Sequence, residues 1–200
     1  LGADGRYFAK VTDDSFDWIR LEKNAGYIRD FFAASGKPCT ALIVPSPAGI
    51  LRDMLPENAP YFNEDKAFGQ LGDILGGTLL DSRETLSAVD DPYYHTDHHW
   101  TTMGAQAAYT LWAQATGHTA RSYDLTLATD SFRGTLYSKV LLPDSVYDSV
   151  YYAPEITVES VVCDGEDGAL YDLSALEQKD KYELFLGGNY GQCVITTGTE

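Results

Sequence analysis

Three of the four histidines in this 200-residue chain fall within five positions, and Asp97 lies among His95, His98 and His99. The segment reads YYHTDHHWTTMGAQAAY, and its second half has the pattern of a capped helix. The positive end of a helix dipole disfavours an imidazolium, so a histidine at a helix entry tends to stay neutral. A general base must be neutral to accept a proton, so the position of this cluster predicts proton-transfer chemistry.

Asp97 and His99 have the spacing expected of an orienting carboxylate and the histidine base that it supports. In extended backbone the side chains of residues i and i+2 point to the same side, and a tight bend before the helix can bring a carboxylate to an imidazole nitrogen. The carboxylate would then fix one tautomer of the ring and stabilise its charged form, as in a Ser-His-Asp triad. His98 lies on the opposite side and, like His95, is expected to support the pair or to contact substrate.

Two other interpretations of the cluster stay open. A buried Asp–His pair can simply satisfy its own hydrogen bonds, although several titratable groups gathered at one place are more typical of a functional site. Alternatively, the nitrogen and oxygen donors of residues 95, 97, 98 and 99 could hold a metal ion. Consecutive ligands crowd one another, and outside the cluster only His118 remains as a histidine. We therefore predict no bound transition metal and no cofactor, and keep a metal-dependent hydrolase as an alternative.

The composition narrows the class of partner. Thirty acidic residues against 14 basic ones give a net charge of −16, which repels phosphate backbones and anionic lipid head groups, so we expect no nucleic-acid partner. Cys39, Cys163 and Cys193 lack the spacing of a zinc site; Cys163 and Cys193 would pair only in an oxidising compartment. No signal peptide or long apolar run is present, which fits either a cytosolic domain or one whose targeting segment lies outside these residues.

The hydrophobic pattern predicts an α/β domain. Helical periodicity marks residues 15–35, 64–75 and 101–116, while residues 39–45 and 76–81 are short apolar strands. Alternating helices and strands are typical of a mostly parallel sheet with crossover helices. Residues 146–162 alternate as in an antiparallel strand or hairpin, and 193–197 form a further strand. We expect a single domain over residues 1–200 with a surface insertion at about 144–180.

The tetrapeptide DHHW at residues 97–100, followed by the continuation T-x-x-G-A, is called the motif below. It resembles the signature of the bacterial DHHW protein family, which in turn resembles the SGNH-hydrolase-like proteins of alginate O-acetylation. Weaker likenesses accompany it in GADGRYF, ALIVPSPAGILRDMLPENAPYF, FRGTLYSK and LFLGGNYG. The resemblance implies a three-layer, SGNH-hydrolase-like (flavodoxin-like) fold, incomplete at its C-terminal side. It also implies that Asp97 is the orienting acid, that His99 is the base, and that Trp100 packs beside the site.

The function implied by this resemblance is acyl-ester chemistry, either O-acetyl transfer or ester hydrolysis, on a cell-surface polysaccharide. It would use a serine acyl-enzyme and a membrane-bound O-acyltransferase as partner. The location would be extracytoplasmic, with an N-terminal membrane anchor that these 200 residues do not include. The opposing class is a non-catalytic carbohydrate-binding or assembly module that keeps the His–Asp scaffold.

The nucleophile is the missing member of the triad. In the relatives the serine follows the motif in a Gly-Asp-Ser-like turn, and residues 1–200 contain no such turn, so we expect the serine outside this chain. The prolines on both sides of Ser46 favour a loop role for it, and the order of residues around Ser138 does not fit Ser-x-x-Lys chemistry. Arg133 is a candidate contact for an anionic sugar, although such residues more often pair with nearby carboxylates.

Overall fold

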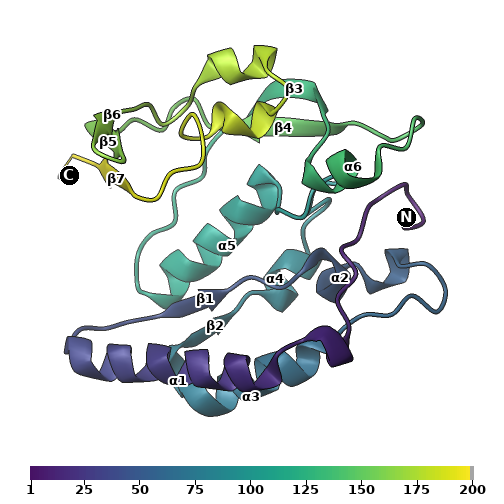
Figure 1. Cartoon of the computed structure of the whole chain (residues 1–200). Coiled ribbons are helices and arrows are strands. Elements are labelled where there is room, and N and C mark those ends of the chain that lie inside the picture. The colour runs from purple at the N-terminus through teal and green to yellow at the C-terminus, as the bar shows by residue number, and fades with distance from the viewer. Residues whose placement is uncertain (199–200) are drawn as a thin grey trace. The chain divides into compact units, whose positions relative to one another are not determined.

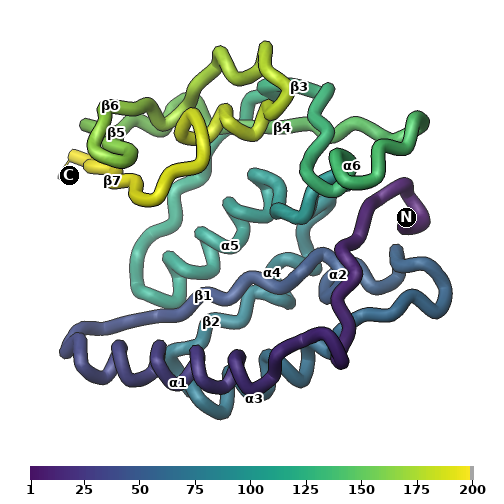
Figure 2. Tube along the Cα trace, viewed as in Figure 1, coloured from purple at the N-terminus to yellow at the C-terminus, as the bar shows by residue number. Residues whose placement is uncertain are grey.

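The computed structural model describes residues 1–198, which divide into two compact units. The first unit comprises residues 1–94 and 98–121; the second comprises residues 95–97 and the chain from Ser122 onward. The backbone therefore enters the second unit for residues 95–97, returns to the first, and leaves it again after residue 121. Figure 2 traces the chain from its purple N-terminus to its yellow C-terminus. The expected single domain with an insertion at 144–180 stays a prediction.

The first unit contains a parallel ladder covered by helices. Strand β1 (Ala41–Ile43) pairs in parallel with β2 (Leu79–Asp81). Helices α1 (Trp18–Ser35) and α3 (Glu64–Leu75) pack on one side of the ladder, and α5 (Thr102–Ala115) lies on the other (Figure 1). The smaller elements are α2 (Pro47–Ile50), α4 (Arg83–Ser87) and 3-10 turns at Asp13–Ser15, Arg52–Met54 and Gly76–Thr78. This order confirms the predicted alternation of helices and strands.

A small apolar core and local capping explain these elements. Ala25 of α1 and Leu71 and Leu75 of α3 are buried together against apolar side chains of both strands. The Asp17 side chain caps α1 by accepting from the Arg20 N–H at 2.9 Å, and Asn63 caps α3 through the Lys66 N–H at 3.0 Å. Such caps satisfy backbone donors that a helix leaves unpaired at its start, so the helices begin where the sequence provides them.

The second unit is built from antiparallel pairs. Strand β3 (Thr126–Phe132) pairs with β4 (Asp148–Tyr152), and β5 (Ser160–Cys163) lies between β6 (Glu166–Asp167) and β7 (Cys193–Thr196). Helix α6 (Thr135–Val140) and 3-10 turns at Leu173–Glu177 and Lys181–Leu184 connect them. Cys163 and Cys193 are register partners in β5 and β7 and form a disulfide, a pairing that the sequence left open.

The observed sheets are smaller than the predicted one. The described residues form a two-stranded parallel sheet, a two-stranded antiparallel sheet and a three-stranded antiparallel sheet. Residues 146–162 do not form a hairpin with themselves, because β4 pairs with β3 whereas β5 pairs with β6 and β7. Alternating, half-exposed strands of this kind favour antiparallel pairing. The mixed α/β class is confirmed, and the mostly parallel character is seen only in the first unit.

None of the helices within residues 1–198 is both long enough and apolar enough to cross a membrane.

Candidate active site

The histidine-rich motif is a tight hairpin. Tyr93 and Trp100 form an antiparallel bridge, and the Tyr94 N–H donates to the His99 carbonyl at 3.2 Å. The buried Arg6 guanidinium anchors the hairpin by donating to the Tyr93 carbonyl and, at 2.6 Å, to the Asp91 carboxylate. The expected bend before the helix is therefore present, and Arg6 gives a structural role to the segment GADGRYF.

Helix α5 starts directly after this hairpin. The Thr101 side chain accepts from the Gly104 N–H at 3.2 Å, which caps the helix, and the Thr101 N–H donates to the Pro92 carbonyl at 2.9 Å. A Cβ at position 104 would lie 2.5 Å from that same carbonyl oxygen. The T-x-x-G spacing of the motif is thus set by close packing of the first helical turn on the hairpin.

A buried carboxylate of β4 holds the beginning of the turn. Asp148, 4% exposed, accepts from the His95 N–H at 2.6 Å and the Thr96 N–H at 2.8 Å. The Thr96 hydroxyl and the His95 Nδ1, 3.2 Å away, also contact it. Burial by itself raises the pKa of the Asp148 carboxyl, but the bonds from His95 and Thr96 outweigh burial and the net pKa is lowered. Asp148 is therefore held in the charged form inside the second unit.

Asp97 is fixed by the start of α6. Its side chain is buried, and Oδ2 accepts from the Thr135 N–H at 2.6 Å and the Thr135 hydroxyl at 2.9 Å. The residue at the N-cap of α6 is Gly134, which has no side chain with which to cap the helix. The Asp97 carboxylate caps α6 instead, by accepting from the Thr135 N–H. This contact gives the glycine and threonine of the segment FRGTLYSK a structural role.

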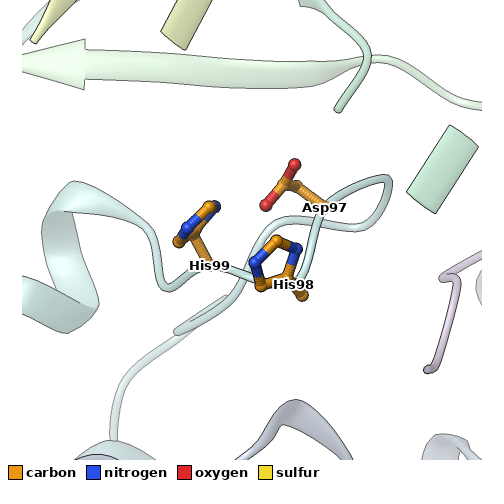
Figure 3. A group of neighbouring side chains, drawn as sticks. All are labelled: Asp97, His98 and His99. Carbon is orange, nitrogen blue, oxygen red and sulfur yellow. The ribbon is translucent and has the colours of Figure 1, made fainter. Parts of the chain in front are cut away.

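His98 and His99 complete the cluster. The ligand-type atoms of Asp97, His98 and His99 all lie within 4.8 Å of one another; Asp97 is buried, whereas both histidines reach solvent. The two imidazole rings are 4.0 Å apart between centroids and tilted by 36°. Figure 3 shows the carboxylate and both rings gathered on one turn of backbone. This arrangement brings a buried, hydrogen-bonded carboxyl group close to accessible imidazoles, which is the requirement for a supported general base.

The supporting candidates have structural contacts of their own. Trp100 is half-buried at the base of the hairpin. The Arg133 guanidinium lies over the rings of Tyr147 (3.9 Å) and Tyr137 (4.6 Å) and donates to the Ser145 carbonyl. It thereby tethers the loop after α6. Contact of Arg133 with substrate stays a prediction, as do the roles of His95 and His98.

The hydroxyls of Ser46 and Ser138, the two serines considered as nucleophile, both take part in local hydrogen bonds. The Ser46 hydroxyl accepts from the Gly49 N–H at 3.2 Å, and the Ser138 hydroxyl donates to the Gly134 carbonyl at 3.2 Å. The Ser46 N–H donates to Glu64 Oε1 at 2.9 Å. Burial raises the pKa of Glu64, although bonds from Ser46 and the charges of Arg52 and Arg83 oppose the rise. These contacts favour the loop role predicted for Ser46.

The comparisons with known proteins concern the fold and the family. A family model described as the SGNH hydrolase-like domain of the acetyltransferase AlgX matches residues 14–146, about two thirds of the chain. The chain belongs to this family. The resemblance seen in the sequence is thereby confirmed at the level of the AlgX family. Among curated proteins, no sequence matches this AlgX-family chain.

Three solved structures resemble the chain. A DHHW family protein from Eubacterium siraeum is 19% identical with a TM-score of 0.66, over 85% of this chain and 62% of that one. Bacillus cereus PatB1 with a sulfonyl adduct is 17% identical with a TM-score of 0.73, over 98% and 73%. The O-acetyltransferase domain of Pseudomonas putida AlgJ is 21% identical with a TM-score of 0.58, over 76% and 62%. At these identities the likeness shows the fold alone, and this chain spans less than two thirds of the DHHW and AlgJ structures.

Proposed function

We propose that this AlgX-family chain carries the base and the orienting acid of a Ser-His-Asp triad for acyl-ester chemistry on a cell-surface polysaccharide. The observation that carries the proposal is the arrangement of Asp97: a buried carboxylate, held at Oδ2 by Thr135, stands within 4.8 Å of two solvent-accessible imidazoles. A carboxylate fixed in this way can hold one tautomer of His99 and stabilise the ring when it gains a proton.

The reaction proceeds through an acetyl-enzyme. His99 takes the proton of a serine hydroxyl while the serine oxygen attacks the acetyl carbonyl, and the donor alcohol leaves with that proton. In the second half, His99 takes the proton of a sugar hydroxyl while the sugar oxygen attacks the acetyl-serine carbonyl; the bond to the serine oxygen breaks, and His99 returns the proton to that oxygen. If water replaces the sugar hydroxyl, the same steps hydrolyse the ester. Asp97 remains ionised throughout.

The serine is proposed to come from outside residues 1–200. The Ser46 and Ser138 hydroxyls are engaged in local hydrogen bonds, and the relatives of known structure are longer than this chain. We extend the proposal to the fold: the two-stranded parallel ladder of the first unit is part of a three-layer SGNH-like sheet.

The setting proposed for this chemistry is outside the cytoplasm, with a membrane anchor and a membrane-bound O-acyltransferase that supplies acetyl groups. The disulfide between Cys163 and Cys193 supports an oxidising compartment, because such bonds persist mainly in secreted and envelope proteins. Membership of an acetyltransferase family supports the acetyl group as cargo.

Covalent labelling tests the triad. A sulfonyl fluoride traps an activated serine, in keeping with the sulfonyl adduct reported for the B. cereus PatB1 structure. We expect the chain extended past Glu200 to gain one adduct by mass spectrometry, on a serine beyond that residue. His99→Ala should abolish the adduct, and His118→Ala, which removes a histidine that stacks on Trp112 outside the motif, should not. An adduct that persists in His99→Ala would overturn the proposal.

A metal-dependent hydrolase is the second candidate, because Asp97, His98 and His99 present three ligand-type atoms close enough to share an ion. Two features weigh against it. The three residues are consecutive, which strains a tetrahedral arrangement, and Oδ2 of Asp97 is already bonded to two donors.

A further inference from the structure

The buried carboxylate of Asp148 does not belong to the proposed catalytic pair, Asp97 and His99. It contacts residues 95 and 96, which precede that pair in the chain. Both of its oxygens are used: Oδ1 accepts the His95 N–H, and Oδ2 accepts the N–H and the hydroxyl of Thr96. A carboxylate with several donors is a strong anchor because the bonds are charge-assisted and shielded from water. Residues 95 and 96 are therefore pinned to β4, immediately before Asp97.

Thr96 also forms hydrogen bonds with the first turn of α6, so it connects Asp148 to that helix. Its hydroxyl, while donating to Asp148, accepts from the Gly134 N–H at 2.9 Å. Its carbonyl accepts from the N–H groups of Leu136 and Tyr137, each at 3.1 Å. Thr96 is fully buried, so these bonds are made without competition from water.

Thr135 is the residue between these attachment points. Gly134 and Leu136 are both bonded to Thr96, and Thr135, flanked by them, gives its N–H and hydroxyl to Asp97 Oδ2. A displacement of Thr96 must therefore shift the Thr135 N–H and hydroxyl, which the Asp97 carboxylate accepts. All of these contacts lie within the second unit.

We propose that Asp148 and Thr96 are positioning residues for the Asp97–His99 pair, acting through Thr135. The proposal rests on the proposed function and adds to it the source of the geometry. It requires the Thr96 hydroxyl in particular, since that group links Asp148 to Gly134. Asparagine at position 148 must turn its NH₂ group toward a donor in either orientation, the His95 N–H or the N–H and hydroxyl of Thr96, so the variant loses at least one of the bonds that pin residues 95 and 96.

The matched test uses Thr96→Val, which keeps the shape of the side chain but removes the hydroxyl, and Thr96→Ser, which keeps the hydroxyl. Asp148→Asn weakens the anchor of the same two residues from β4. Glu64→Gln is the control: it also removes a buried carboxylate, but one in the first unit that accepts from the Ser46 N–H and takes no part in the link from Asp148 to Thr135. The ring nitrogens of His99 are followed by ¹⁵N NMR in the 200-residue chain, because their chemical shifts report which nitrogen carries the proton.

We expect one dominant His99 tautomer in the parent, Thr96→Ser and Glu64→Gln, and a mixture of both tautomers in Thr96→Val and Asp148→Asn. In the chain extended past Glu200, Thr96→Val should lower kcat for an acetyl ester about 100-fold and change KM less than about twofold. Should Thr96→Val not fold, the comparison of Thr135→Val with Thr135→Ser replaces it. Thr135→Val removes the hydroxyl that donates to Asp97, and Thr135→Ser keeps it.

A single His99 tautomer in folded Thr96→Val and Asp148→Asn would overturn the positioning role, whatever their melting temperatures. The two proposals fail separately. If these variants mix the tautomers but no acetyl ester is turned over by any chain, the positioning role stands and the acyl-transfer function falls.

Discussion

The Asp97 carboxylate occupies the space in which a side chain at position 134 would begin. A Cβ on Gly134 would lie 2.3 Å from both Cβ and Oδ2 of Asp97, far inside van der Waals contact. This close approach allows the Thr135 N–H and hydroxyl to reach Asp97. The glycine of FRGTLYSK is therefore part of the mechanism that orients the carboxylate.

Replacement of this glycine tests the packing. Gly134→Ala is expected to destabilise the protein by about 1–3 kcal/mol, because neither the backbone of residue 134 nor the pinned carboxylate can give way easily. Gly69→Ala is the matched control: Gly69 lies inside α3 with no atom near its missing Cβ, so alanine should stabilise by about 0.5–1 kcal/mol. Urea unfolding measures both. Equal effects of the two substitutions would contradict the close approach at Gly134.

Asp148 should give the second unit a characteristic acid sensitivity. Its pKa is lowered in the folded protein, so its stabilising effect is complete above the ordinary aspartate value near 3.8 and is lost as pH falls through the lower folded pKa. Asp148→Asn should lower the free energy of unfolding by about 1–3 kcal/mol at pH 7. The deficit should shrink below pH 4 in urea titrations. A deficit that is constant from pH 7 to pH 2 would show that the charge of Asp148 contributes nothing.

Glu64 should behave in the opposite sense. Burial raises its pKa, and Oε2 is buried without a hydrogen-bond partner among the described residues. The folded state thus holds the proton more tightly than the unfolded state, and stability falls as pH rises from about 4.5 through the folded pKa. Glu64→Gln resembles the protonated acid, so the variant should gain stability relative to the parent as pH rises. A relative loss of stability between pH 4 and pH 8 would contradict this account.

No transition metal should bind stoichiometrically at the motif. Protein prepared without chelators should contain well under one zinc or iron per chain by elemental analysis, and His98→Ala should leave that content unchanged. One equivalent of metal that disappears in His98→Ala would establish the metal-dependent hydrolase instead.

The sequence located the motif and most elements of the first unit because the signals are local. Helix α3 begins and ends as predicted at residues 64 and 75, where Asn63 caps it and Gly76 follows. The contacts of Asp148 and Thr135 with the motif could not be predicted, since these residues lie 52 and 39 positions beyond Thr96 and a lone acid or threonine carries no pattern. Gly134 belongs to the segment FRGTLYSK, whose resemblance to the family carries no information on its contact with Asp97. Long-range bonds of this kind depend on strand pairing, which period-2 alternation indicates without naming the partner.

Trp112 of α5 is 37% exposed, and its ring stacks with those of Tyr109 and His118. Helical spacing identifies a stripe but not its width. The buried residues of α5 are Gly104, Ala108 and Ala113, because small side chains let the helix pack closely.

Turnover of para-nitrophenyl acetate tests the central claim most directly, measured side by side for the 200-residue chain, for the chain extended past Glu200, and for His99→Ala and Asp97→Asn in both. The 200-residue chain should hydrolyse the ester no faster than its own His99→Ala variant, because a His–Asp pair without an attacking hydroxyl is only a base. The extended chain should turn over, and Asp97→Asn should lower its kcat by about 10⁴-fold. Turnover by the short chain that is lost in Ser46→Ala would contradict the placement of the nucleophile, and an extended chain inert toward several acetyl donors would favour a carbohydrate-binding module.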